Sequence, residues 1–253
     1  MDKVTVLSAL GDNYIYLYEY AKGRALAVDP CDGDLVLSEV NQRGLSLTDV
    51  LVTHHHWDHT AGVEKIKSQT GARVVGADAE RIAGIDLAVG DGDSVGCGDI
   101  KVHVLGTPGH TRTSVCYYIK DVDGSGIVFT GDTLFVGGCG RLFECGAAVM
   151  WDSLQKLASL GGNTQVYCGH DYTEENLEFA LSVVPDDKYF QDQLKQVRKC
   201  IDAGKIVHST IGQEKLSNIF LRANDVAVQR TLSMSSAGEA EVFTELRRRK
   251  DRF

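Results

Sequence analysis

Four histidines and an aspartate crowd into one short segment of the chain, which reads T-H-H-H-W-D-H-T over residues 53–60. Imidazole nitrogens and carboxylate oxygens are ordinary ligands of zinc, iron and manganese in proteins. A plain turn does not need so many ligand side chains at this spacing, so the segment predicts a metal site. The side chains expected to bind are His54, His56, Asp58 and His59. His55 lies between two of them and is expected to point away.

Three more residues of ligand type each follow a strand-like segment and at least one glycine: His110, Asp132 and His170. Taken singly, each has a simpler interpretation, as a structural histidine or as the aspartate of a turn. If the strands end at one edge of a sheet, however, these loops converge with residues 53–60. Five imidazoles and two carboxylates exceed the four ligands of one tetrahedral zinc. The sequence therefore favours two metals that share one carboxylate, with zinc first and iron or manganese as alternatives.

Residues 1–172 alternate between strand-like and helical patterns, as expected for an α/β domain. Apolar and aromatic patterns predict strands at 4–7, 14–20, 24–28, 49–52, 72–75, 99–105, 114–119, 127–129 and 165–167. Helical spacing and stop signals predict helices at 32–42, 60–69 and 149–160. After residue 172 the pattern is amphipathic at helical spacing, at 173–183, 187–203, 214–223 and 239–249. We therefore expect a metal-binding catalytic domain at 1–172 and a smaller helical domain at 173–253.

The balance of charge limits the classes of partner. The chain has 26 basic and 35 acidic residues and a net charge of −9, which is unfavourable for general binding to nucleic acid or an anionic membrane. No apolar run approaches the roughly 18–20 residues of a membrane span, and the first residues carry no targeting pattern. The seven cysteines include no C-x-x-C pair, so reduced thiols are expected. We expect a cytoplasmic protein without a nucleic acid or membrane partner, and a monomer.

The order of the motifs resembles a known family. T-H-H-H-W-D-H-T is followed by T-P-G-H-T, G-D-T-L-F and C-G-H-D-Y, as in the metallo-β-lactamase superfamily. The segment G-D-T-L-F-V-G-G-C-G-R at 131–141 and the basic end of the chain resemble glyoxalase II, the hydroxyacylglutathione hydrolases, more closely. The resemblance covers nearly the whole chain. It implies an α/β fold, the αββα metallo-β-lactamase sandwich, with a smaller C-terminal helical domain that binds glutathione.

The resemblance also distributes the ligands. It implies that His54, His56 and His110 bind one divalent metal and that Asp58, His59 and His170 bind a second. Asp132 would bridge the two metals together with a hydroxide, so Asp58 and Asp132 are the expected catalytic residues. Asp29 would orient a ligand imidazole, although an Asp-Pro turn explains it nearly as well.

The implied reaction is the hydrolysis of S-D-lactoylglutathione to D-lactate and glutathione, a step of methylglyoxal detoxification. A water bound to a divalent metal can have its pKa lowered to ~7, so a metal-bridging hydroxide would serve as the nucleophile without a separate base. The leaving thiol has a pKa of ~8.5 and needs no general acid. The alternatives are a mononuclear iron persulfide dioxygenase of the same superfamily and a hydrolase of another thioester. A metal-dependent binding module without catalysis is a third, and its signature would be a lost ligand.

Five further side chains are implied to bind the glutathione thioester: Arg141, Phe143, Tyr172, Arg247 and Lys250. The three cations would hold a substrate carboxylate, which arginine can do with two hydrogen bonds. A solvated helix end is the simpler interpretation of Arg247 and Lys250, and a packed aromatic ring that of Tyr172. Phe143 stands where the family commonly has a tyrosine, so one hydroxyl contact to glutathione is expected to be missing.

Overall fold

Two β-sheets face each other in the computed structural model, which describes residues 3–120 and 126–253. In the first sheet, neighbouring strands follow the chain: β1 (Val4–Ala9), β2 (Asn13–Ala21), β3 (Arg24–Val28), β4 (Ser46–Val52), β5 (Arg73–Gly76) and β6 (Leu87–Ala88). The second sheet has the order β14 (Ser209–Thr210), β13 (Thr164–Cys168), β10 (Gly126–Gly131), β9 (Val115–Lys120), β8 (Ile100–Gly106) and β7 (Ser94–Cys97). A small ribbon of β11 (Leu134–Phe135) and β12 (Gly138–Cys139) follows β10.

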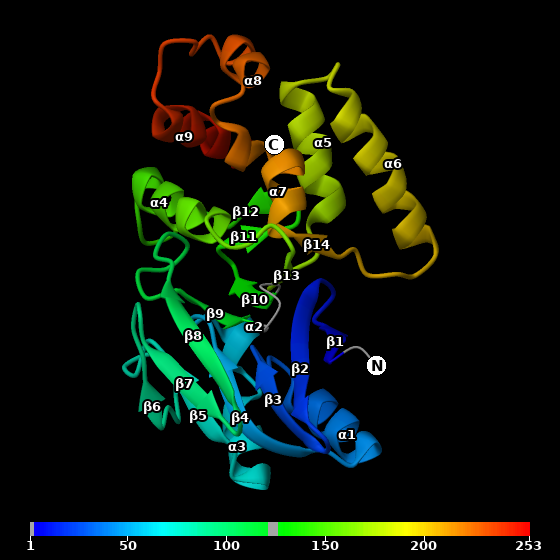
Figure 1. Ribbon diagram of the computed structural model, residues 1–253, viewed down its shortest axis with the longest axis vertical. Helices are drawn as coiled ribbons and strands as arrows, with labels where there is room; N and C mark the ends of the chain where they lie inside the picture. Colours follow the sequence, from blue (N-terminus) through cyan, green and yellow to red (C-terminus); the bar gives the residue numbers. More distant parts are fainter. Residues whose placement is uncertain (1–2, 121–125) are drawn as a thin grey trace.

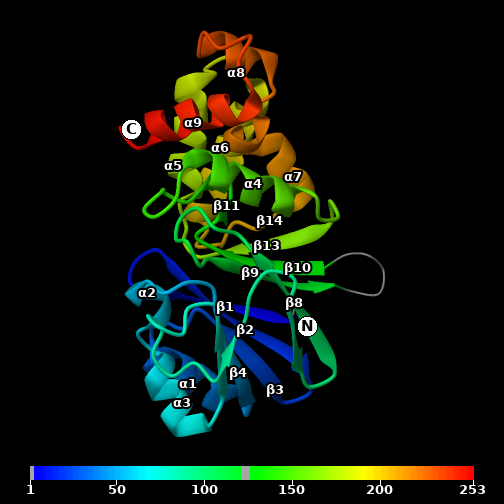
Figure 2. The ribbon, with the colours of Figure 1, turned by 90° about the vertical axis from the view of Figure 1, so that its left-hand side faces the viewer.

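Helices cover both outer faces of the pair of sheets (Figures 1 and 2). The first sheet carries α1 (Gly33–Arg43) and α3 (Val63–Thr70), while the short α2 (Trp57–Thr60) follows β4. The second sheet is covered by α4 (Ala147–Ala158) and by the C-terminal helices: α5 (Thr173–Val183), α6 (Lys188–Asp202), α7 (Ile211–Ser217), the 3-10 helix η1 (Ile219–Arg222), α8 (Val226–Thr231) and α9 (Glu239–Lys250). The predicted αββα sandwich with a helical C-terminal region is therefore confirmed.

The side chains of β2 show how the strands fill the sandwich. Tyr14, Tyr16 and Tyr18 enter the apolar layer between the two sheets, while Ile15 and Leu17 enter the layer under α1 and α3. Successive side chains of a strand point to opposite faces, so a strand covered on both faces is apolar throughout. The period-two tyrosines thus mark the face toward the second sheet.

Two predicted helices are each broken in two. The helix expected at 60–69 is divided between α2 and α3 at Gly62, whose N–H donates to the Pro30 carbonyl at 2.9 Å. A Cβ there would lie 2.5 Å from Gly33 N, so the residue lets α1 and α3 pack closely. The helix expected at 214–223 breaks at Asn218, whose side chain instead accepts from Phe220 N and donates to Gly138 O. Tertiary contacts decide both interruptions.

Several short elements lacked a signal in the sequence. The patterns missed the strands β6, β7, β11, β12 and β14 and the helix α8. Most of them are only two residues long, and they exist because a neighbouring segment offers hydrogen bonds. β14 is an example, since Ser209 and Thr210 pair with β13 although they follow the predicted boundary at residue 172.

The helices after residue 172 share one apolar core with α4 and with the outer face of the second sheet. This core includes Trp151 of α4, Phe220 of η1 and Phe243 of α9. The ring centroids of Trp151 and Phe243 are 5.7 Å apart, and those of Phe220 and Phe243 are 6.0 Å apart. The C-terminal helices are therefore packed on the sandwich rather than tethered to it.

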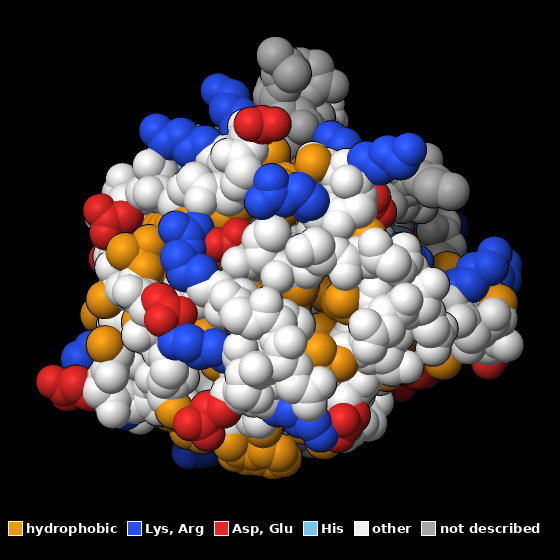
Figure 3. All heavy atoms as spheres, turned by 90° about the horizontal axis from the view of Figure 1, so that it is seen from below, with side chains coloured by type: hydrophobic (Ala, Val, Ile, Leu, Met, Phe, Trp, Pro, Cys, Tyr) orange, Lys and Arg blue, Asp and Glu red, His pale blue; other side chains and the backbone are white. Residues whose placement is uncertain are grey.

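Three further features of the structure concern the cysteines, the length and apolarity of the helices, and the charge on the surface. All seven cysteines are free, and five of them are buried. Among the described residues, no helix is both long enough and apolar enough to cross a membrane. Lysine and arginine side chains are mixed with aspartate and glutamate on the face seen in Figure 3.

The shared core predicts that the two regions unfold together. Phe243→Ala would leave a cavity among fully buried side chains, so we expect a loss of about 3–5 kcal/mol in the free energy of unfolding. Urea denaturation followed by both tryptophan fluorescence and circular dichroism should give one transition at a lower midpoint. Two separate transitions, with only one displaced, would show that the regions fold independently.

Candidate metal centre

The loops that follow β4, β8, β10 and β13 meet at one end of the sandwich, as predicted. Two backbone hydrogen bonds meet at Gly169, in the loop after β13: Tyr14 N–H of β2 donates to Gly169 O at 2.8 Å, and Gly169 N–H donates to the carbonyl of Gly131, at the end of β10, at 2.9 Å. The contacts are close because glycine has no side chain. A Cβ on Gly169 would lie 2.3 Å from the carboxylate of Asp132, and one on Gly131 would lie 2.3 Å from the hydroxyl of Thr53.

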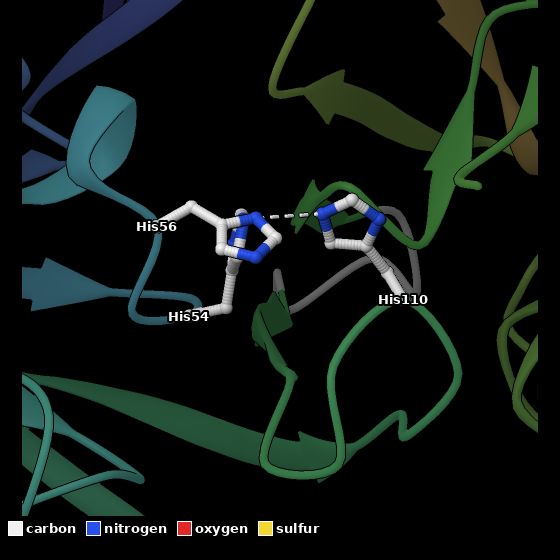
Figure 4. A group of neighbouring side chains, drawn as sticks. All are labelled: His54, His56 and His110. Atoms are coloured by element: carbon white, nitrogen blue, oxygen red, sulfur yellow. Dashed lines mark hydrogen bonds between the residues drawn. The ribbon is translucent and has the colours of Figure 1, made fainter. Parts of the chain in front are cut away.

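The first group of ligands consists of His54, His56 and His110 (Figure 4). His54 and His56 come from the loop after β4, and His110 reaches them from the loop after β8. His56 Nδ1 lies 3.1 Å from His54 Nε2 and 3.0 Å from His110 Nε2. Three imidazole nitrogens facing one point form a ready set of metal ligands.

The second group consists of Asp58, His59 and His170. The Nε2 atoms of the two imidazoles are 3.2 Å apart. Asp58 Oδ2 lies 3.6 Å from His59 Nε2 and 3.4 Å from His170 Nε2. Two imidazoles and one carboxylate form a second candidate ligand set, and the two groups match the division that the family resemblance implies.

Asp132 lies between the two groups. Its Oδ2 is 3.2 Å from His110 Nε2 and 3.4 Å from His170 Nε2, and its Oδ1 is 3.3 Å from His59 Nε2. Oδ1 is buried and accepts no hydrogen bond from the described residues. A buried carboxylate oxygen without a donor is costly unless a cation balances it. The structure thus brings all seven predicted ligands together, and the donor set fits divalent metal ions.

The nitrogen atoms turned away from the site are also held. Thr53 donates to Asp29 from its N–H at 2.7 Å and from its hydroxyl at 2.6 Å. The hydroxyl oxygen then accepts from His54 Nδ1 at 3.1 Å, and Asp29 Oδ2 accepts from His59 Nδ1 at 2.9 Å. These bonds place the proton on Nδ1 and leave Nε2 free for a metal. Asp29 therefore makes the contact with a predicted ligand imidazole that the resemblance implies, and its φ of 49° lies in the left-handed region.

Three further partners of the predicted ligands were not predicted from the sequence: the carbonyl of Arg141 and the side chains of Asp12 and Asn13. His110 Nδ1 donates to the carbonyl of Arg141 at 2.8 Å, and His170 Nδ1 donates to Asp12 Oδ1 at 2.9 Å. Asn13 donates from its side chain to Asp58 Oδ2 at 3.2 Å. Asp12 precedes β2 and Asn13 is its first residue, and nothing in their local pattern indicates that they meet side chains from distant loops.

The pKa values of the histidines in the centre are shifted in opposite directions. Burial lowers the pKa of His54 well below its usual range and lowers that of His56 to about 4. Burial would also lower the pKa of His59, but Asp132 and Asp29 raise it to about 9. Burial works against ionisation of Asp132, yet His59 and its neighbours hold its pKa well below the usual range. The buried carboxylates are therefore stabilised by positive charge at the point where the predicted ligand nitrogens meet.

A cavity of about 580 Å³ opens above the metal centre, and all five predicted substrate residues line it. Arg247 donates to Cys139 O at 2.9 Å and pairs with Asp251 at 2.9 Å. Lys250 pairs with Glu175, and burial lowers its pKa. The side chains of Arg247 and Lys250 are only 6% and 8% exposed, so they are not the cations of a solvated helix end.

The other predicted substrate residues lie near the ligands. Arg141 is largely exposed at the rim of the cavity. The ring of Phe143 meets His56 and His110 edge-on, with centroid distances of 5.7 and 5.1 Å. Tyr172 stacks on His170 with ring centroids 5.0 Å apart. The ring of Tyr172 is therefore packed against another ring, as its simpler interpretation expects.

The sequence did not indicate several other residues of the cavity wall: Trp57, Phe135, Cys139, Glu175 and Asn176. Trp57 had a local signal, because it lies inside the ligand run. The others come from the ribbon after β10 and from α5, and only the packing of α5 against that ribbon brings them to the cavity.

Comparisons with known proteins agree with this geometry. A family model described as the metallo-beta-lactamase superfamily matches residues 10–170, and one described as hydroxyacylglutathione hydrolase C-terminus matches residues 171–253. The hydroxyacylglutathione hydrolase of Maricaulis maris is 46% identical over 96% of both chains, and that of Rhodospirillum rubrum is 42% identical over 98% of this chain and 97% of its own. The structure of ETHE1 from Myxococcus xanthus is similar with a TM-score of 0.68 and 28% identity, over 97% of this chain and 89% of the other. On the evidence of the fold, the ligands and these relatives, the chain belongs to the hydroxyacylglutathione hydrolase family of the metallo-β-lactamase superfamily.

Proposed function

We propose that the protein is a binuclear metal-dependent hydrolase that converts S-D-lactoylglutathione and water to D-lactate and glutathione. The observation that carries this proposal is the position of Asp132 between two three-ligand groups, at the floor of a cavity walled by cations. Zinc is the first candidate for both ions, with iron or manganese as alternatives, because the imidazole and carboxylate ligands suit all three.

When bound, the ions would supply a hydroxide nucleophile at neutral pH and Lewis-acid polarisation of the thioester carbonyl. The protein's own part is to keep Asp132 ionised, to supply the Asp58 carboxylate beside His59 and His170, and to hold the imidazoles with their free nitrogens toward the ions. The partners of His54, His59, His110 and His170 fix these orientations before substrate arrives.

The walls of the cavity support the glutathione part of the proposal. Arg141, Arg247 and Lys250 would hold a carboxylate of the substrate, and Tyr172 would donate its hydroxyl to the substrate backbone. Phe143 provides an apolar edge and no hydroxyl. We propose that residues 1–172 form the metal-binding catalytic domain and that residues 173–253 form the glutathione-binding domain.

The alternative functions are less well supported. A mononuclear iron persulfide dioxygenase would need three ligands, whereas seven converge here. If the substrate is a different thioester, the metal site is the same, and the two substrates differ in how they fit against Phe143.

We also propose a monomer that acts in the cytoplasm without a nucleic acid or membrane partner. The free cysteines suit a reducing compartment, and the net charge of −9 disfavours polyanionic partners. One chain supplies all the ligands and all the cavity walls described above, so a single copy is sufficient for the site.

The decisive experiment measures the loss of thioester absorbance with S-D-lactoylglutathione and, in the same sample, the metal content by mass spectrometry. Rapid hydrolysis with close to two metals per chain would support the binuclear hydrolase. Two metals per chain without hydrolysis of S-D-lactoylglutathione would indicate that the substrate is another thioester. One iron, with oxygen uptake on glutathione persulfide, would favour the dioxygenase.

Removal of a ligand should remove the reaction. We expect His54→Ala and Asp132→Ala to lose both turnover and stoichiometric metal, because each side chain faces the shared centre. Metal analysis and thioester hydrolysis check both losses together. His103→Ala, on β8, is the matched control and should keep both. Full activity of a metal-free ligand variant would exclude the mechanism.

Weakening the support of His59 should weaken metal binding without removing a proposed ligand. Asp29→Asn keeps the shape but not the charge at Thr53 and His59, so we expect metal affinity to fall about 10- to 100-fold. Competition with a chelator measures this change, and Asp34→Asn, which alters an exposed carboxylate of α1, serves as the control. Equal affinity in both variants would mean that Asp29 does not tune the metal site.

Lys250 should contribute to substrate binding more than to turnover. Lys250 Nζ lies over the rings of Phe179 and Phe253, and Lys250→Met keeps an unbranched side chain there while the charge is lost. We expect KM for lactoylglutathione to rise about tenfold with little change in kcat. The reason is that the lost charged hydrogen bond would stabilise the bound substrate and the transition state equally. Steady-state kinetics beside Arg198→Met, which breaks exposed ion pairs of α6, tests this. An unchanged KM would remove Lys250 from the binding site.

A further inference from the structure

A short segment separates the metal cavity from a second cavity. This wall segment, residues 141–144, follows the β11–β12 ribbon and lies beside the loop that carries His110. Arg141 and Phe143 line the metal cavity, whereas Phe143 and Glu144 line a neighbouring cavity of about 710 Å³. The wall segment therefore has open space behind it, and its position must be fixed by specific contacts.

Backbone contacts fix one side of the wall segment. The carbonyl of Arg141 accepts from His110 Nδ1 at 2.8 Å, and the N–H of Phe143 donates to His110 O at 3.3 Å. The second of these bonds is long, so by itself it holds Phe143 weakly. Phe143 is 61% exposed, and its ring contacts described above are the edge-on ones with His56 and His110.

Glu144 supplies a stronger fastening immediately after Phe143. Its Oε1 accepts from Arg81 Nη1 at 2.5 Å, and its Oε2 accepts from the N–H of Arg112 at 2.7 Å. These bonds, chiefly the one from Arg81, lower the pKa of Glu144 to about 2, so the carboxylate is charged throughout the neutral range. A charged hydrogen bond to a guanidinium is stronger than a neutral one.

Arg81 is itself held in place. Its Nε donates to Asp78 Oδ2 at 2.6 Å, and Asp78 is buried. Its Nη2 donates to Thr113 Oγ1 at 3.2 Å, and its Nη1 lies 3.2 Å from His55 Nε2. His55, the histidine of the ligand run that was expected to point away, thus lies against this guanidinium. Arg81 joins the ligand run, the His110 loop and the wall segment.

We propose that the ion pair of Arg81 and Glu144 is a positioning device that holds Arg141 and Phe143 against the metal cavity and thereby sets the affinity for the glutathione thioester. The inference rests on the proposed function for the identity of the substrate. Neither Arg81 nor Glu144 lines the metal cavity, so both act through the wall segment. Without the pair, the wall segment can move toward the open cavity behind it, and its contacts with substrate are lost in ground state and transition state alike.

This role predicts a change in KM and not in kcat. Glu144→Gln and Arg81→Met should each raise KM about tenfold, with kcat within about twofold of the original enzyme and the metal content unchanged. The double variant should be no worse than the more severe single one, because both changes break the same pair. Lys65→Met breaks an ion pair of similar length, 2.6 Å to Asp34, whose two residues line neither cavity, and is the control.

Hydrogen exchange supplies a readout that does not depend on activity. The amides of Arg112 and Phe143 should exchange faster in Glu144→Gln than in the Lys65→Met control, because the wall segment is released. Faster exchange with a raised KM supports the proposal. An unchanged KM, unchanged exchange, or a fall in kcat with loss of metal overturns it. If the original enzyme is inactive on every glutathione thioester, the proposed function fails, while faster exchange would still support the positioning role.

Discussion

The centre depends on one buried carboxylate. Asp132 lies within hydrogen-bonding range of imidazoles from both ligand groups, and one of its oxygens accepts no hydrogen bond from the described residues. Such a group is stable in the interior only if positive charge stands beside it. The surrounding loops must therefore present lone pairs to the same small volume. This requirement explains the close approach at Gly131 and Gly169, where a side chain would collide with Thr53 or with Asp132 itself.

The sandwich satisfies this requirement because it ends several strands at one edge. Gly169, after β13 of the second sheet, accepts a backbone hydrogen bond from Tyr14 of the first sheet and donates one to Gly131 at the end of β10. The loop after β4 is joined to the second sheet separately, because Val115 N–H donates to Thr53 O. The second sheet is also the floor for α4 and the C-terminal helices, whose shared core fixes α9 over the cavity. The same packing that stabilises the helices thus places Arg247 and Lys250 opposite the metal ligands.

The charged side chains around the cavity are already paired in the structure. Arg247 pairs with Asp251 and Lys250 with Glu175, so a substrate carboxylate would have to share or replace these partners. The charged side chains that hold the wall segment are paired in the same way, since Glu144 and Arg81 neutralise each other beside the site. Pre-pairing keeps long cationic side chains ordered, which reduces the entropy that binding must otherwise remove.

Residue types and their order along the chain were enough to predict the candidate ligands, the order of the main elements and the family. Ligand types and strand periodicity are local properties, so residues 53–60 and the tyrosines of β2 could be interpreted without coordinates. The partners that orient those side chains depend on packing between distant segments. His170 and Asp12 are 158 positions apart, and Glu144 and Arg81 are 63 apart. No local pattern specifies such pairs, because they form only when packing brings distant loops together. The breaks at Gly62 and Asn218 have the same cause, since close contact with another segment there outweighed helical propensity.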